Sequence, residues 1–228
     1  MTNLIPPSAT SHQPTSTRLR HLGDAFWPGL LIVVYGAVQA DGAVLTTAYR
    51  EASPISDDRL SYPWDGAAAV TTSVVWGLSQ ILFVIGLRAF ATSAALTRRS
   101  GRRGAWSAVV GASLFVAAHA VSIPLHDADV DDAGAVAVFT LFGLGTILTA
   151  GGLLAAGIDV ARSRIWTDWR RLTPLALGVW MVAMIPLQFT PALAIVVGVY
   201  ALLAAALGIA LLVESAARAD AATPPLRT

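Results

Sequence analysis

An uncharged stretch of about twenty residues, from Gly104 to Ile123, constrains the fold of this chain most strongly. Four arginines within six residues precede it, and Pro124 and an acidic segment, residues 126–132, follow it. At about 1.5 Å of rise per residue, twenty helical residues cover the roughly 30 Å of hydrocarbon in a bilayer. The stretch therefore predicts a transmembrane helix with a basic end and an acidic end.

The composition extends this interpretation to the whole chain. Of its 228 residues, 55% are hydrophobic and only 13% are charged, whereas about 25% are charged in soluble domains. Lipid around most of the surface explains this shortage of charge. We therefore expect an all-α polytopic membrane protein, in which the number of apolar runs decides the architecture.

Six apolar runs predict a bundle of six transmembrane helices. We place them at about residues 26–49, 67–87, 104–123, 133–158, 172–189 and 192–213. Pro28 is expected in the first turn of the first helix, and Pro186 is expected to kink or end the fifth helix near Gln188. Small residues four apart in the fourth run, such as Gly152 and Ala156, predict close helix packing.

The charges between these runs predict the orientation of the chain. With both termini on the cytoplasmic side, thirteen of the fifteen arginines are cytoplasmic, and only Arg50 and Arg59 lie outside. Eight of the fourteen acidic residues then fall outside. Cytoplasmic loops of membrane proteins carry such an excess of basic residues. We predict a multi-pass protein of the bacterial plasma (inner) membrane, with a disordered cytoplasmic tail over residues 1–25 and a cytoplasmic tail over residues 214–228.

Two ionisable residues, Asp41 and His119, fall within the apolar runs. Asp41 lies fifteen residues after Phe26, and His119 lies fourteen residues after Ala105, on helices that run in the same direction. Both are therefore expected roughly 21–23 Å from the cytoplasmic end, in the outer leaflet. Ionisable residues at that depth are costly and mark functional sites.

Other polar residues are expected close to these two. Gln39, Gln188 and His126 are predicted at or near the same level, and Gln80 is the only strongly polar side chain of the second run. These four residues are candidate ligand-binding residues of a polar pocket that opens outward.

The pattern leaves two interpretations of Asp41 and His119 open. In one, the two are catalytic: Asp41 orients His119 or holds its proton, so that they form a general acid/base pair. In the other, they make a structural hydrogen bond between the first and third helices, or they are close enough to the interface to be wetted.

The acidic segment that follows the third run alternates carboxylates like the start of a calcium loop. An EF-hand loop needs Gly at its sixth position and Glu at its twelfth, and here these positions hold Asp132 and Val138. Weak metal binding by Asp127, Asp129 and Asp131 is left open beside the simpler reading of an acidic outer loop. No other metal site is predicted.

Several classes of chemistry are excluded by residue type. The chain has no cysteine and no lysine, which excludes disulfides, thiolate metal sites and Schiff-base cofactors. A net charge of +1 gives no case for a nucleic-acid partner. We expect no cofactor, and the expected partners are membrane lipids together with a small amphiphilic ligand or a protein partner.

Two local patterns carry a family resemblance. The segment Asp58-Arg59-Leu60-Ser61-Tyr62-Pro63-Trp64 precedes the second run, and Ala161-Arg162-Ser163 through Trp169-Arg170-Arg171 precedes a Pro-Leu-Ala-Leu-Gly run. In these patterns the chain resembles small six-span integral membrane proteins of high-GC actinobacteria. The resemblance covers most of the chain and implies the fold type and a plasma-membrane location, but no activity.

Two functions follow from these patterns. The first is a non-catalytic membrane module that binds a lipid or small amphiphile, or that acts as a sensor, a transporter-like protein or a subunit of a complex. The alternative is an integral-membrane enzyme that acts on a lipid or isoprenoid substrate through Asp41 and His119. The sequence leaves open whether the protein is an enzyme.

Overall fold

A computed structural model describes residues 15–187, 190 and 192–221 of the chain. The described residues form six α-helices and one short 3₁₀ helix. Their bounds are α1 Thr15–Arg50, α2 Gly66–Ala91, α3 Arg99–Ser122, α4 Ala133–Ser163, η1 Asp168–Leu172, α5 Thr173–Leu187 and α6 Leu193–Ala221.

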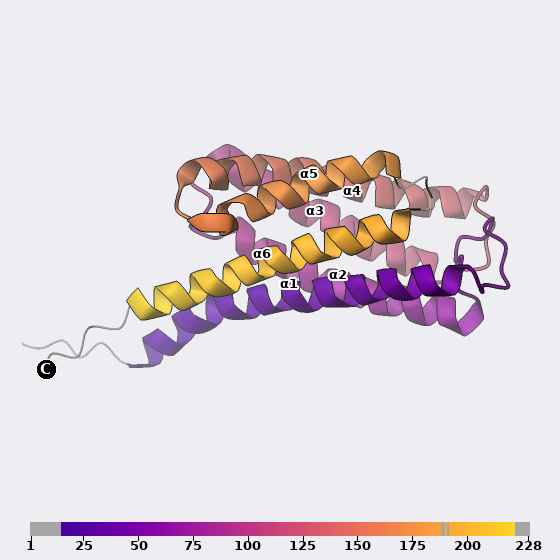
Figure 1. Cartoon of the computed structure of the whole chain (residues 1–228), viewed down its shortest axis with the longest axis horizontal. Coiled ribbons are helices and arrows are strands. Elements are labelled where there is room, and N and C mark those ends of the chain that lie inside the picture. The colour runs from indigo at the N-terminus through magenta and orange to yellow at the C-terminus, as the bar shows by residue number, and fades with distance from the viewer. Residues whose placement is uncertain (1–14, 188–189, 191, 222–228) are drawn as a thin grey trace, which may run out of the picture.

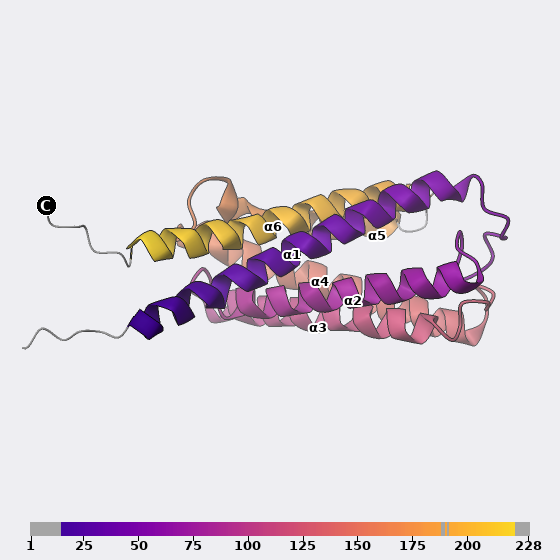
Figure 2. The ribbon, with the colours of Figure 1, turned by 90° about the horizontal axis from the view of Figure 1, so that it is seen from below.

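The six α-helices lie side by side, and each runs antiparallel to the helix before it in the chain (Figure 1). Each helix packs against its neighbours in the sequence, and α1 also packs against α6, so that the contacts form a closed ring. The contacts of α1 with α6 and of α3 with α4 are the most extensive. The first and last helices extend together past the others at one end (Figure 2). Between α5 and α6, the indole N–H of Trp180 donates to the carbonyl oxygen of Val196 at 3.0 Å.

Glycines bring α1 and α6 into close contact. A Cβ atom at Gly36 would lie 2.6 Å from the carbonyl oxygen of Ala201, and one at Gly208 would lie 2.7 Å from that of Gly29. No side chain fits at such distances, so the two backbones touch directly. In lipid, this close approach is a main source of helix–helix attraction.

The same device joins α3 to α4. A Cβ atom at Gly152 would lie 2.4 Å from the carbonyl oxygen of Gly104, and one at Gly111 would meet Thr149. The close packing predicted from the small residues of the fourth run is therefore confirmed for Gly152. Its neighbour Gly151 has nothing within 4 Å of its Cβ position, because it faces away from α3.

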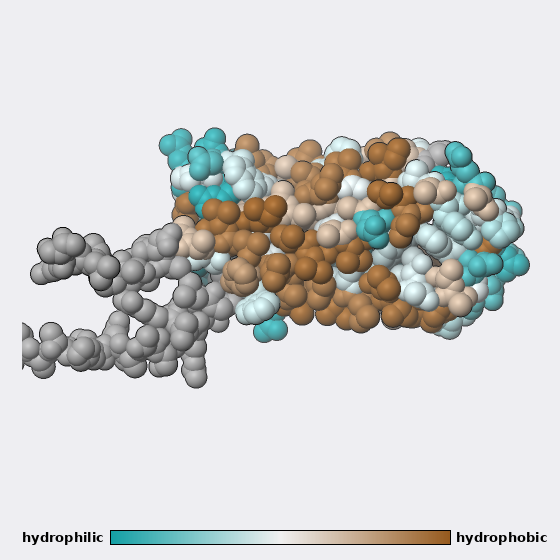
Figure 3. Space-filling view, turned by 60° about the horizontal axis from the view of Figure 1, so that its bottom comes forward, coloured by the Kyte–Doolittle hydropathy of each residue, from teal (hydrophilic) through white to brown (hydrophobic). Residues whose placement is uncertain are grey.

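On the face that Figure 3 shows, an apolar belt covers most of the middle of the bundle, and hydrophilic surface gathers mainly at the two ends. Five helices are long and apolar enough to cross a membrane: α1 from Phe26 onward, α2, α3, α4 and α6 up to Arg218. Within the fifth predicted span, α5 has 15 residues up to Leu187 and includes Pro186, and residues 188 and 189 lie outside the described residues. At about 1.5 Å per residue α5 covers roughly 22 Å.

Several helices run beyond their predicted spans. The first helix begins at Thr15, so residues 15–25, which were expected to be a disordered tail, are helical. The last helix continues to Ala221, past the predicted boundary at residue 213. Adding residues to an existing helix is cheap compared with starting one. Because α1 begins at Thr15, Pro28 lies inside the helix and not in its first turn, where it was predicted.

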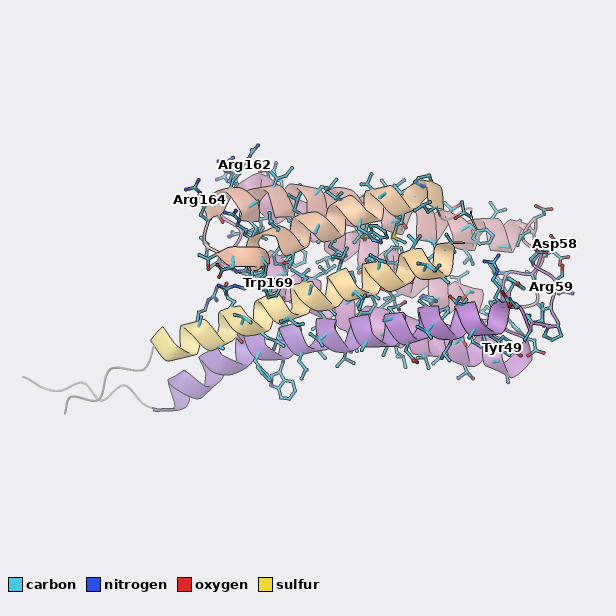
Figure 4. The ribbon with its side chains drawn as sticks, viewed as in Figure 1. Tyr49, Asp58, Arg59, Arg162, Arg164 and Trp169 are labelled. Carbon is cyan, nitrogen blue, oxygen red and sulfur yellow. The ribbon has the colours of Figure 1, made fainter. Side chains whose placement is uncertain are left out.

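The two ends of the bundle carry different charges. Arg162, Arg164 and Trp169 lie at one end, and Tyr49, Asp58 and Arg59 lie at the other (Figure 4).

At the second end, the loop before α2 pairs with the loop before α4. The backbone amide of Leu60 donates to the carbonyl oxygen of Ala128, and the backbone amide of Val130 donates to the carbonyl oxygen of Asp58. The loops therefore tie the two helical hairpins together.

Candidate functional site

Asp41 and His119 differ in their environment. Asp41 is exposed on the outer surface of α1. His119 is buried on α3 with 9% of its surface exposed. Both lie at the level of Trp76 on α2, since a Cβ atom at Gly42 would lie 2.5 Å from Trp76 Nε1 and the Trp76 and His119 rings are 6.3 Å apart between centroids.

The structure does not bring Asp41 and His119 together. Helix α2 lies between α1 and α3 in the ring, and Trp76 stands between the two residues. Among the described residues, Asp41 makes neither a hydrogen bond nor an ion pair. Side chains two positions apart on a helix differ by about 200° in direction, so the buried Gln39 sends Asp41 to the opposite face. In this conformation the predicted acid/base pair is not assembled.

His119 is surrounded mainly by aromatic rings. The rings of Phe142 and His119 form a T-shaped pair with 5.1 Å between centroids and an interplanar angle of 83°, and the Trp76 ring is inclined to the imidazole by 67°. Gly77 on α2 leaves room for the histidine, because a Cβ atom there would lie 3.1 Å from His119 Cβ. Within the described chain the imidazole has no hydrogen-bond partner, so His119 acts here as a packed ring.

Gln39 takes part in a hydrogen-bonded link between α1 and α2. Its Nε2 donates to Ser79 Oγ at 2.9 Å, and Ser79 Oγ donates to the carbonyl oxygen of Trp76 at 2.8 Å. Gln39 and Ser79 are both buried, with 7% and 3% of their surfaces exposed. The link gives the Gln39 amide group and the Ser79 hydroxyl hydrogen bonds within the bundle, which favours a glutamine at this depth.

A second polar group, the tyrosine–glutamine cluster, consists of Tyr35 on α1, Gln80 on α2 and Tyr200 on α6. The two phenolic oxygens share a hydrogen bond of 2.9 Å, and the Gln80 side chain lies beside the Tyr35 hydroxyl. Phe83 stacks on Tyr35 at 4.5 Å between centroids, with an interplanar angle of 15°. Tyr200 meets the ring of Phe83 edge-on at 6.2 Å, so all three rings hold one another in place.

The tyrosine–glutamine cluster keeps unused hydrogen-bonding capacity. Gln80 Oε1 is buried and has no hydrogen-bond partner among the described residues. Two phenols that share one hydrogen bond use only one of their two protons in it. The cluster therefore keeps a free acceptor and a second phenolic proton, and it is packed among Phe83 and neighbouring core residues.

Tyr35 and Tyr200 are site residues that the sequence analysis missed. They are 165 positions apart and meet only because α1 packs against α6. A partial signal exists for Tyr35, which lies four residues before Gln39 and therefore on the same helix face. Nothing comparable marks Tyr200.

The acidic segment does not gather its carboxylates. Among the described residues, no three His, Cys, Asp or Glu side chains come together in a way that could hold a metal ion. Arg59 instead pairs with Asp129 at 3.4 Å, and its guanidinium also contacts the carbonyl oxygen of Asp127. Metal binding by Asp127, Asp129 and Asp131 therefore stays a prediction that these contacts do not support, because one of the three carboxylates, that of Asp129, is paired with an arginine.

The last two predicted ligand-binding residues lie outside the buried polar region. His126 is half-buried in the loop after α3, where its Nδ1 lies 3.0 Å from the carbonyl oxygen of Ile123 and its Nε2 lies 3.2 Å from the Asp127 carboxylate. Both ring nitrogens of His126 therefore have partners within the loop that follows α3. Gln188 lies outside the described residues.

A buried carboxylate at the arginine-rich end was also missed. Asp159 on α4, only 3% exposed, accepts hydrogen bonds from the backbone amides of Thr97 and Arg98 at 2.9 Å and from the Thr97 hydroxyl at 3.0 Å. It thereby caps the start of α3 from a neighbouring helix. A Cβ atom at Gly101 would lie 2.3 Å from Asp159 Oδ2, so the glycine provides the space for this cap.

Comparison of the chain with known protein families, with characterised proteins and with solved structures finds no match. The resemblance to small actinobacterial membrane proteins therefore stays a prediction.

Proposed function

We propose that this chain is an integral membrane protein that binds a small neutral amphiphile inside its ring of helices, with the polar group of the ligand held by the tyrosine–glutamine cluster. The apolar belt and the five long apolar helices support a membrane location. Gln80 is the residue on which the proposed binding depends.

The proposed topology has six spans, with both termini on the cytoplasmic side of a bacterial plasma membrane. We count α5 as a span in addition to the five long apolar helices, and its packing against both α4 and α6 supports this. The alternation of the helices places the loop with Arg162 and Arg164 at the end opposite the loop with Asp58 and Arg59. Excess arginine on the cytoplasmic side supports this orientation.

The single observation that carries the proposal is the unpartnered Oε1 atom of Gln80. A buried acceptor without a donor costs about 1–3 kcal/mol, and hydrocarbon offers no water to relieve that cost. A ligand hydroxyl that donates to this atom removes the cost. Binding is then favoured at this place over any fully satisfied part of the bundle.

The chemistry of the cluster selects the polar group of the ligand. Tyr35, Gln80 and Tyr200 offer neutral donors and acceptors, and none of them carries a formal charge at neutral pH. An alcohol can donate to Gln80 Oε1 and accept from a phenol at the same time, whereas a carboxylate or phosphate would be desolvated without a counter-charge. The aromatic and aliphatic side chains packed around the cluster match an alkyl or isoprenoid chain in polarity.

The test uses a photoreactive long-chain alcohol with the full-length chain in lipid nanodiscs. We expect saturable labelling that the unlabelled alcohol prevents and that an alkane or an alkyl sulfate of equal length does not prevent. Gln80→Met keeps the size and removes the amide, and it should lower labelling at least ten-fold. The matched control is Thr140→Val, because this exposed hydroxyl bonds only to the Val136 carbonyl of its own helix.

A stability measurement separates binding from packing. Without ligand, Gln80→Met removes the unpaired acceptor, worth about 1–3 kcal/mol, and also the hydrogen bond of Gln80 to Tyr35, worth about 0.5–1.5 kcal/mol. The free energy of unfolding should therefore rise by at most about 2 kcal/mol. Equal labelling of wild type and Gln80→Met would show that the cluster only holds the helices together. In that case the proposed function would be wrong.

A further inference from the structure

The outward surface of α1 carries a regular stripe of exposed residues. These residues, here called the Asp41 face, are Val34, Ala37, Asp41, Val44 and Ala48. Their spacing alternates between three and four positions, which is the repeat by which one helix packs along another. Val34 and Val44 are 41% and 67% exposed, so no helix of the described chain covers the stripe.

Asp41 lies well inside the apolar belt. It is eight residues before Tyr49, which stacks on Trp64 at 5.0 Å between ring centroids in the position of an interfacial aromatic anchor. Eight residues correspond to about 12 Å along the helix. On α6, Gly198 is level with Ala43, and Ile195, one turn nearer the same end, is 65% exposed. Apolar surface therefore continues past Asp41 toward the interface, beyond the reach of so short a side chain.

The described chain offers Asp41 no counter-charge. Its carboxylate has no donor among the described residues, and every described arginine lies in a loop or within two turns of a helix end. A carboxylate that faces lipid at this depth is costly, and charged groups within a membrane pair with one another. A counter-charge for Asp41 is therefore to be sought outside the described part of the chain.

We propose that the Asp41 face docks a transmembrane helix of another protein, and that this helix carries an arginine or lysine at the depth of Asp41. Charge complementarity selects a basic partner. A second copy of this chain is disfavoured because it has no basic residue at that depth in its described part. The spacing of the face fits a helix that crosses α1 at a small angle, and Ala37 and Ala48 allow it to approach closely. One polar position in an apolar seam fixes the register of such a pair.

The test places the full-length chain in lipid vesicles with a synthetic leucine–alanine transmembrane helix that carries one arginine eight residues inside its outer end. Energy transfer between dyes on the two reports association. We expect saturable transfer that weakens at least ten-fold when the arginine of the synthetic helix is replaced by leucine. Asp41→Leu should cause the same loss, whereas Thr71→Val, at an exposed position of α2 whose hydroxyl bonds to its own helix, should cause none.

Cysteine crosslinking locates the contact, because the chain has no cysteine of its own. With a cysteine placed in the synthetic helix, Ala37→Cys and Val44→Cys should crosslink to it, and Val75→Cys on the exposed surface of α2 should not. Crosslinks between two copies of the chain without the added helix would assign the face to self-association and overturn the proposal. Association that ignores Asp41, or no association with either helix, would also overturn it.

Discussion

Adjacent glycines in α4 provide a direct test of the helix packing. A Cβ atom at Gly151 would meet nothing within 4 Å, whereas one at Gly152 would lie 2.4 Å from the carbonyl oxygen of Gly104 and 2.5 Å from the amide nitrogen of Ala108. Gly151→Ala and Gly152→Ala therefore make the same chemical change at neighbouring positions. Only the second change forces α3 and α4 apart.

The expected difference can be estimated from two opposing effects. Alanine is favoured over glycine in a helix interior by about 0.8–1.0 kcal/mol, and this gain applies equally at both positions. At Gly152 the added methyl group overlaps backbone atoms that cannot rotate away, and overpacking of this kind costs about 1–3 kcal/mol. Gly152→Ala should therefore be less stable than Gly151→Ala by about 1–3 kcal/mol, the overpacking cost alone.

The assay is reversible unfolding in mixed micelles of a mild detergent and sodium dodecyl sulfate, followed by far-ultraviolet circular dichroism. Gly151→Ala should be as stable as wild type or more stable. Gly152→Ala should unfold at a lower mole fraction of dodecyl sulfate. Equal stability of the two variants, or a greater loss in Gly151→Ala, would show that α3 and α4 are not packed through the Gly104–Gly152 contact.

Two further predictions concern the ends of the bundle. Asp159→Ala should lower the free energy of unfolding by about 1–3 kcal/mol, because the amides of Thr97 and Arg98 lose a buried charged acceptor. The same micelle titration measures this, and a loss below about 0.5 kcal/mol would refute the capping role. Arg59→Ala removes an exposed ion pair with Asp129 and should cost about 0–1 kcal/mol, a difference checked by the same titration at low and high salt.

The helical character of the fold follows from the sequence because apolar runs of this length have few alternatives in lipid. The depth of a residue in the membrane could also be predicted, because a fixed rise per residue put Asp41 and His119 on one level. Trp76 lies beside both His119 and Gly42, the neighbour of Asp41, which agrees with a common level. The direction of a side chain around its helix is a different quantity. It depends on which face the neighbouring helices cover, and Asp41 points away from the bundle.

Contacts between distant segments could not be predicted from the sequence, because they too depend on which helices pack together. Gln39 and Gln80 stood out because amides are rare in apolar runs, whereas the Tyr35–Tyr200 pair depends on α1 meeting α6 across the whole chain. Asp159 looked like a loop residue, because its role comes from the free amides at the start of α3 and not from its own neighbours. The predicted tail over residues 1–25 was too long, because hydropathy marks where a membrane ends and not where a helix ends.

The pairing of α1 with α6 also sets an order for the making of the protein. Gly29 and Gly208, which touch in the finished ring, leave the ribosome about 180 residues apart, and at about 5–20 residues per second this separates them by roughly 10–40 s. During that time the glycine face of α1 has only lipid or the insertion machinery beside it. The ring therefore closes last, when α6 arrives, and a chain that stops before α6 would remain an open row of helices exposed to membrane quality control.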